Sequence, residues 1–173
     1  TGAWLEIGQI LTADEIRELK TADDFEVGYQ QAIKYLSYRI RSEREVSDNL
    51  KKHNFSDEVI QAVLERLRRL QLVDDRQFAQ VWVENRNEFR PRGQRALRME
   101  LRQKGIDDHI ISEVLEDLDE ETLAHQAAAK QSHKYSGLPW EDFRRKLLAF
   151  LARRGFHYGI AMPVVERAWS EFG

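Results

Sequence analysis

Apolar residues recur along most of the chain at intervals of three and four positions, with polar residues between them. This spacing places the apolar side chains on one face of an α-helix, so it predicts helices and requires no strands. We expect a short N-terminal helix near 12–20. Nine further helices are predicted at 25–40, 43–53, 57–70, 75–89, 94–104, 108–118, 120–135, 139–154 and 158–171.

Three predicted helix starts carry the residues of a capping box, in which a short polar side chain and a Glu or Gln three positions later bond to each other's backbone N–H. The pairs are Thr12 with Glu15, Ser42 with Glu45, and Asp74 with Gln77. Asp74 and Asp75 could also be a paired-carboxylate site, but the cap explains Asp74 and Gln77 together and is the favoured interpretation.

The apolar pattern repeats along the chain. Eight apolar positions between Val46 and Leu67 stay apolar when the sequence is shifted by 51 residues and again after a further shift of 50. Asn54, Gly105 and Gly155 fall at one position of this repeat, and these residue types tolerate the left-handed conformation that ends many helices. A period of this length indicates units that stack on their neighbours.

The sequence therefore predicts an all-α fold: an elongated and curved tandem array of three three-helix repeats, each of about 50 residues. The expected domains are an N-terminal extension with its helix at 1–24 and repeats at 25–73, 74–119 and 120–173. Pro163 falls inside the last helix, where its missing N–H and its ring predict a kink. We expect the third repeat to be the least regular.

Composition narrows the class of protein. Apolar residues make up 42% and charged residues 33% of the chain, which is typical of a globular protein with many surface ion pairs. The chain has no cysteine, which excludes disulfides and thiol chemistry and fits a reducing cytoplasm. Because no apolar run approaches the ~18 residues that span a bilayer, we expect a soluble cytoplasmic protein. The chain begins with Thr1-Gly2 instead of methionine, which leaves open whether an N-terminal domain precedes it.

Charge is segregated along the chain. The net charge of −3 argues against a protein whose whole surface binds DNA. From Arg86 to Lys104, however, seven basic residues face two acidic ones, whereas Asp107 to Glu121 holds eight acidic residues and no Lys or Arg. This distribution is typical of an adaptor between unlike partners.

Arginine predominates among the basic candidates, and its planar fork donates hydrogen bonds in pairs to a phosphate or a carboxylate. In the helix at 94–104, Leu97 and Leu101 define the buried side and leave the arginines outside it. The candidates for binding DNA or an acidic protein surface are Arg86, Arg90, Arg92, Arg95, Arg98, Arg102, Lys104, Arg144, Arg145, Arg153 and Arg154. The alternative is a solvated face paired with Glu100 and the acidic helix beyond it. Phe89 is the one aromatic residue whose neighbours suggest exposure, since Trp82 and Phe78 fit the core better.

Two groups of residues resemble the RecX family in their order and spacing. The first group is Tyr35-Leu36-Ser37-Tyr38-Arg39, Arg41-Ser42, Glu45-Val46 and Leu50, which is similar to the opening of the first RecX repeat. The second is Leu72-Val73-Asp74-Asp75, Phe78-Ala79, Arg92-Gly93, Leu97, Leu101 and Gly105-Ile106, which is similar to the second repeat. The resemblance covers about residues 29–118.

This resemblance implies a non-enzymatic regulator, mainly an inhibitor, of the RecA recombinase in DNA repair, recombination and the SOS response. Such a regulator binds the RecA–DNA filament and limits its extension and strand exchange. The implied partners are that filament and, through it, single- or double-stranded DNA. No membrane partner is expected, and the protein is expected to be a monomer. Longer relatives carry a β-rich segment before the first repeat, of which only Trp4–Ile10 could be a remnant here.

Enzyme chemistry finds little support in the sequence. It holds no glycine-rich phosphate loop, nucleophile elbow or HExxH segment. His125 and His133 are eight residues apart, which separates them by ~12 Å on a helix, too far for one metal ion. We therefore expect no catalytic residues, metal or cofactor. The alternatives are a stand-alone helical nucleic-acid-binding protein, such as a transcription regulator with helix-turn-helix units, and a structural scaffold. Direct DNA contact, the sign and strength of regulation, and oligomeric state stay open.

Overall fold

The computed structural model describes residues 12–172, which form helices and no strands. They fall into two compact units that divide between Val73 and Asp74. No helix in this range is long and apolar enough to span a membrane. The segment Trp4–Ile10, expected as the remnant of a β-rich part, lies outside the described residues.

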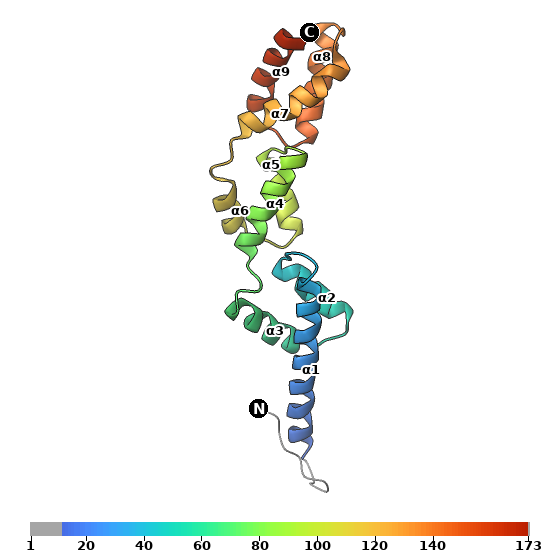
Figure 1. The fold of residues 1–173 in the computed structure, drawn as a ribbon, viewed down its shortest axis with the longest axis vertical. Coiled ribbons are helices and arrows are strands. Elements are labelled where there is room, and N and C mark those ends of the chain that lie inside the picture. Colours follow the sequence, from blue (N-terminus) through green and yellow to red (C-terminus); the bar gives the residue numbers. More distant parts are fainter. Residues whose placement is uncertain (1–11, 173) are drawn as a thin grey trace. The chain divides into compact units, whose positions relative to one another are not determined.

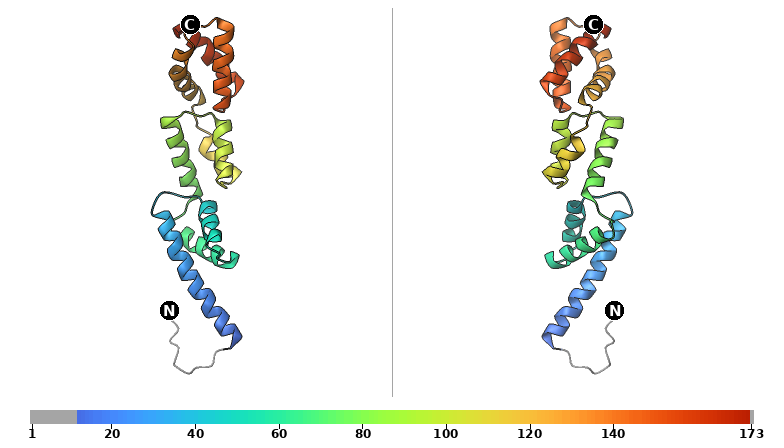
Figure 2. Two further views of the ribbon diagram at one scale, coloured as in Figure 1. Left: turned by 90° about the vertical axis from the view of Figure 1, so that its right-hand side faces the viewer. Right: turned by 90° about the vertical axis from the view of Figure 1, so that its left-hand side faces the viewer.

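The first unit consists of α1 (Ala13–Leu36), α2 (Glu43–Lys52) and α3 (Asp57–Arg69) (Figure 1). All three helices pack against one another. Their shared core includes Ala32, Val46, Leu50, Val63 and Leu67, each fully buried. The N-terminal half of α1 extends beyond α2 and α3 (Figures 1 and 2).

α1 differs from the prediction. The two helices expected at 12–20 and 25–40 are one continuous helix of 24 residues that ends at Leu36. The intervening residues 21–24 contain no Gly or Pro, so nothing in the backbone stops the helix there. The hydroxyl of Thr21 donates to the carbonyl of Arg17 at 2.9 Å, a bond that α-helical geometry provides. The separate N-terminal helix is therefore the first part of α1.

The second unit contains two three-helix groups. The first group is α4 (Asp75–Phe89), α5 (Gln94–Gln103) and α6 (Asp108–Leu115). The second group is α7 (Glu120–Ser132), the short 3₁₀ helix η1 (His133–Tyr135), α8 (Trp140–Arg153) and α9 (Tyr158–Phe172). Its core is one buried cluster around Phe143, Leu147, Leu151 and Val164. The prediction of an all-α fold is confirmed.

Equivalent repeat positions are equivalent in burial and in backbone shape. Leu50, Leu101 and Leu151 are each 0% exposed. The residues four positions later are left-handed as predicted: Asn54 has φ 63°, Gly105 79° and Gly155 87°. In each turn the following N–H donates to the leucine carbonyl, which satisfies a backbone group that the helix end leaves open. These bonds join Phe55 to Leu50, Ile106 to Leu101 and Phe156 to Leu151, at 3.3, 3.1 and 3.1 Å.

Two of the three predicted capping boxes are complete, and the third is present as a side-chain cap only. Thr12 with Glu15 and Ser42 with Glu45 form complete capping boxes. Asp74 begins α4 by accepting from the N–H groups of Arg76 and Gln77, at 2.8 and 3.0 Å. This use of its carboxylate supports the cap over the paired-carboxylate interpretation.

The third repeat (α7 to α9) is less regular than the second repeat (α4 to α6), since η1 follows α7. Pro163 lies inside α9 on an exposed position, and helix is present on both sides of it. A proline ring that faces solvent has no core neighbour to displace.

Candidate partner-binding surface

The predicted basic candidates all lie in the second unit, on α4, α5, α8 and the turns after them. Because Leu97 and Leu101 are fully buried, α5 directs its arginines away from the core. Arg95 and Arg102 are exposed and Arg98 is half-buried. The arginines of α5 therefore lie outside its buried side, as the sequence predicts.

The turn before α5 touches the turn after α8 through backbone atoms. The N–H of Gly93 donates to the carbonyl of Arg154 at 3.0 Å. A Cβ on Gly93 would lie 2.4 Å from the carbonyl oxygen of Gly155, and a Cβ on Gly155 would lie 2.4 Å from the backbone nitrogen of Ala96. Only glycine at both positions permits this approach. We call this contact the glycine joint.

A carboxylate from the third repeat strengthens the same joint. Gly93 begins α5 without a side chain that could cap it. Instead, Glu120 Oε1 at the start of α7 accepts from the N–H of Gln94 at 3.0 Å. A carboxylate at a helix N-terminus meets both an open N–H and the positive end of the helix dipole. The third repeat therefore supplies the cap that the N-terminus of α5, in the second repeat, lacks.

Three arginines gather beside the glycine joint: Arg90, Arg92 and Arg154. Burial lowers the pKa of Arg154, and the positive charges of Arg92 and then Arg90 lower it further. Arginine stays charged in proteins, so this direction reports unfavourable surroundings and not deprotonation. Arg90 is exposed, and within residues 12–172 neither it nor Arg154 forms an ion pair. We call these three residues the arginine cluster.

Arg92 differs from its two neighbours because it has a carboxylate partner. Its guanidinium lies 3.0 Å from Glu100 Oε1, but its Nε is buried and has no hydrogen-bond partner. Arg86 Nε donates to Glu100 Oε2 at 2.8 Å, and the indole N–H of Trp82 donates to the same oxygen at 2.9 Å. Glu100 of α5 therefore pairs with two of the candidate cations, Arg86 of α4 and Arg92 of the turn that follows α4.

Cation–π contacts add to this packing. The guanidinium carbon of Arg86 lies 4.4 Å from the ring centroid of Trp82, and Lys104 Nζ lies 4.9 Å from it. Arg86 and Lys104 thus have structural roles on the ring of Trp82.

On the other side of α5, Arg102 pairs with the acidic α6. Its guanidinium donates to both oxygens of Asp108, at 2.7 and 3.1 Å. This hydrogen bonding raises the pKa of Arg102 and lowers the pKa of Asp108. Arg98 donates to the hydroxyl of Ser112 at 3.2 Å. For Arg102, the structure favours the alternative interpretation, in which the arginine lies on a solvated face and pairs with the acidic helix.

The candidates on α8 also divide into cations with a carboxylate partner and cations without one. Arg144 bonds to Glu141 at 3.0 Å and Arg145 to Asp142 at 2.6 Å, both on their own helix. Arg153 is exposed, and in the described part of the chain it forms no ion pair. The structure therefore brings Arg90 to Arg154. With Arg153, which precedes Arg154 in the sequence, these are cations without carboxylate partners in the described part of the chain.

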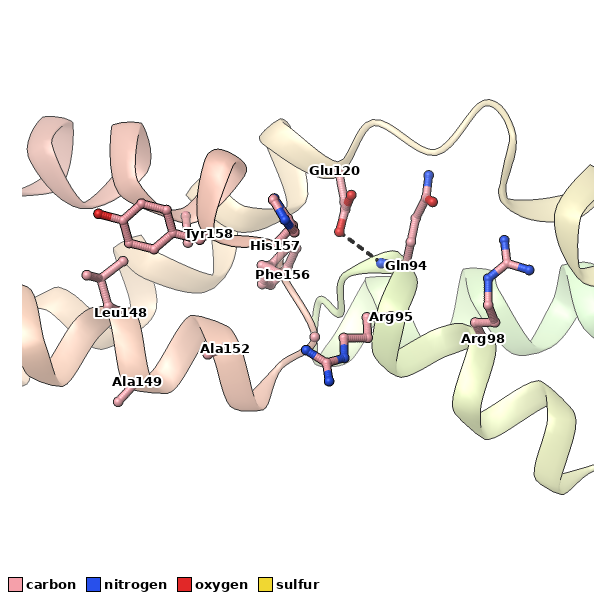
Figure 3. Close-up of a pocket in the computed structure, with 12 residues that line it drawn as sticks. Gln94, Arg95, Arg98, Glu120, Leu148, Ala149, Ala152, Phe156, His157 and Tyr158 are labelled. Atoms are coloured by element: carbon pink, nitrogen blue, oxygen red, sulfur yellow. Dashed lines mark hydrogen bonds between the residues drawn. The ribbon is translucent and has the colours of Figure 1, made fainter.

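A cleft with a volume of about 760 Å³ lies between α5 and the α8–α9 pair, and no pattern in the sequence indicates it. Figure 3 shows Arg95 and Arg98 of α5 on one side of it and Leu148, Ala149 and Ala152 of α8 on the other. The cleft exists because the glycine joint fixes the third repeat against α5, a contact between positions about 60 residues apart that no local pattern reports.

Phe89, the aromatic residue singled out from the sequence, is 69% exposed at the end of α4. Among residues 12–172, no group of three or more His, Asp or Glu side chains could hold a metal ion.

Family models match three segments of the chain. They describe the first, second and third three-helix domains of RecX and match residues 29–67, 74–115 and 119–165. The chain belongs to the RecX family. The RecX resemblance of the sequence is therefore confirmed, and the glycine joint lies between the second and third RecX domains.

Individual RecX proteins agree with this assignment. The chain is 38% identical to the regulatory protein RecX of Mycolicibacterium smegmatis over 141 residues, which cover 78% of this chain and 75% of that protein. It is 34% identical to the regulatory protein RecX of Bacillus licheniformis over 165 residues, which cover 94% of this chain but 63% of that protein's length. A crystal structure of RecX from Lactobacillus salivarius superposes with a TM-score of 0.78 at 28% identity, over 86% of this chain and 99% of that one.

RecX membership assigns the chain to a family of regulatory proteins, and these matches indicate no catalytic activity.

Proposed function

We propose that this RecX-family protein regulates the RecA recombinase in the cytoplasm, mainly as an inhibitor. It binds the RecA–DNA filament as a monomer and limits filament extension and strand exchange during DNA repair and recombination. The observation that carries the proposal is the approach of Arg90 to Arg154 at the glycine joint, with Arg153 next to Arg154 in the sequence. None of these three cations has a carboxylate partner within the described residues.

Such a surface suits a nucleoprotein filament. Guanidinium groups bind phosphates and carboxylates in the same planar, paired geometry, and a filament of protein on DNA presents both. Burial is the main cause of the lowered pKa of Arg154, and repulsion by Arg92 and Arg90 adds to it. An approaching anion offsets this repulsion, which favours anion binding at Arg154. The net charge of −3 opposes tight binding to bare DNA and favours a target that also offers protein contacts.

The test is charge reversal at these three positions. We expect Arg90→Glu, Arg153→Glu and Arg154→Glu together to raise the protein concentration needed for half-inhibition of RecA strand exchange at least about tenfold. The fold should survive, because Arg90 and Arg153 are exposed and a glutamate at 154 would face Arg92, which the variant retains. Far-ultraviolet circular dichroism checks the helix content.

A matched control reverses three exposed arginines elsewhere, Arg17, Arg69 and Arg167, with the same change in net charge. We expect this control to inhibit like the wild type. Full inhibition by the first variant, or an equal loss in both, would contradict the proposal. A parallel titration of DNA without RecA separates the alternative function: sequence-specific binding with a steep salt dependence would indicate a stand-alone DNA-binding protein.

A further inference from the structure

The cleft between α5 and the α8–α9 pair has two chemically different sides. Leu148, Ala149, Ala152 and Ala161 give the third-repeat side an apolar surface, and three of these four are alanines, whose small side chains leave the volume of about 760 Å³ open. That volume lies in the range of ligand-binding pockets in proteins. The shape and lining fit a bulky apolar group that enters from solvent.

An aromatic residue at the cleft adds exposed apolar surface. Tyr158, which lines the cleft at the start of α9, is 63% exposed (Figure 3). Its neighbour Phe156 is buried in the core of the third repeat, so the backbone at this point is fixed. A concave apolar surface with polar residues around it marks a binding site more often than an isolated exposed residue does.

The opposite side of the cleft is cationic, and Asp108 of α6, whose carboxylate interacts electrostatically with Arg98, already forms an ion pair with Arg102. Arg95 is exposed and forms no ion pair among the residues that the structure describes, and Arg98 bonds to the neutral hydroxyl of Ser112. Glu120 is the only acidic residue among those described as lining the cleft. Its Oε1 is already bonded to the N–H of Gln94. The cleft therefore offers positive charge to an incoming ligand and little negative charge.

From this complementarity we infer that the cleft docks a protein segment in which a large apolar side chain is flanked, within one helical turn, by Asp or Glu. The apolar side chain fills the space beside Ala149 and Ala152, and the carboxylate pairs with Arg95 and Arg98. A DNA backbone would satisfy the arginines but would leave the apolar side unused, so a protein ligand fits better. This inference rests on the proposed function, and the segment belongs to the recombinase.

The first test fills the cleft. Ala149→Trp places an indole where the apolar side chain would dock, and we expect binding to the RecA–DNA filament to weaken at least about tenfold. The control is Ala129→Trp, on an exposed position of α7 that does not line the cleft, and we expect it to bind like the wild type. Equal filament affinity of the two tryptophan variants would overturn the inference.

A second variant covers the case in which tryptophan at 149 disturbs α8. Arg95→Glu with Arg98→Glu leaves the apolar side intact and reverses the charge of the other side. We expect a similar loss of filament binding, with helix content and melting temperature near those of the wild type. Unchanged binding would overturn the predicted pairing with carboxylates.

A third measurement identifies the ligand directly. A photoreactive benzoylphenylalanine at position 158, where Tyr158 already lines the cleft with an exposed aromatic ring, should cross-link to RecA in the assembled filament, and mass spectrometry should find an apolar residue with Asp or Glu within four positions at the cross-linked site. Cross-linking to DNA, or to a segment without acidic residues, would overturn the inference.

The two proposals fail separately. If reversal at Arg90, Arg153 and Arg154 abolishes inhibition while Ala149→Trp binds normally, the proposed function stands and the cleft inference is wrong. A wild-type protein that does not bind the filament overturns both.

Discussion

At the scale of single residues, two glycines decide how the second and third repeats meet. Gly155 is needed twice: its φ of 87° is unfavourable for other residues, and the space at its Cβ position is already occupied by Ala96. Gly93 has an ordinary backbone conformation, yet its Cβ position lies 2.4 Å from the Gly155 carbonyl. The glycine joint therefore depends on close backbone approach as well as on backbone conformation.

Gly155→Ala should separate these two requirements when it is compared with Gly137→Ala. Gly137 has φ 78° but nothing within 4 Å of its Cβ position, so its substitution costs only the left-handed strain, about 1 kcal/mol. At Gly155 the same strain is joined by overlap with the backbone of Ala96, and we expect a loss of at least about 3 kcal/mol. Urea unfolding followed by circular dichroism measures both, and equal losses would contradict a joint based on close approach.

At the scale of helices, most elements begin with a side-chain cap, but the caps differ in burial and in the number of hydrogen bonds they form. Ser42 is fully buried and forms both halves of a capping box with Glu45, which is itself held by two bonds from Arg39. Ser56 is exposed, and its hydroxyl accepts one bond, from the N–H of Val59 at 3.3 Å. A buried helix end has no water to replace a lost cap.

Ser42→Ala should therefore destabilise the protein more than Ser56→Ala, although both serines are the N-caps of helices in the first unit. We expect a loss of about 1–2 kcal/mol at Ser42 and about 0.5 kcal/mol at Ser56. Chemical denaturation monitored at the helix signal gives both values. A larger effect at Ser56 would show that burial does not determine the strength of these caps.

The helices and their repeat were accessible from the sequence because a 3.6-residue period and a helix-ending turn are local signals. Leu50, Leu101 and Leu151, with Asn54, Gly105 and Gly155, carried that information. The sequence predicts separate helices at 12–20 and 25–40 because the residues between them are polar. A polar stretch without Gly or Pro does not end a helix, so the two form one helix, α1. The partners of α5 are only partly accessible from the sequence. The ion pair of Arg102 with Asp108 spans six residues, whereas the hydrogen bond from the backbone N–H of Gln94 to Glu120 spans 26.

At the scale of the whole molecule, opposite charges nearly cancel in total while they separate locally. The chain holds 27 Lys and Arg residues against 30 Asp and Glu residues. Most of the candidate cations are used within the fold, as Arg86, Arg102 and Arg145 illustrate. A surface contact with the filament therefore depends on the few cations that remain without a carboxylate partner, and a small number of substitutions should remove it.

This dependence predicts a measurable change in salt sensitivity. Each phosphate that a cation neutralises on a single strand contributes about −0.7 to the slope of log affinity against log salt concentration. If Arg90, Arg153 and Arg154 each contact a phosphate in the filament, their joint replacement by alanine should make the slope shallower by about 2, because three such contributions are lost. Replacement of Arg17, Arg69 and Arg167 by alanine changes the net charge equally and should leave the slope unchanged.

Fluorescence anisotropy of labelled filament DNA, titrated with protein at several salt concentrations, measures both slopes. An unchanged slope with weaker binding would mean that the three arginines stabilise the complex without displacing ions from phosphate, as contacts inside a protein–protein interface can. An equal change in both variants would assign the effect to net charge, since only a localised contact distinguishes two substitutions that alter the total charge by the same amount. The size of the difference between the two slopes therefore reports how many of these cations meet phosphate.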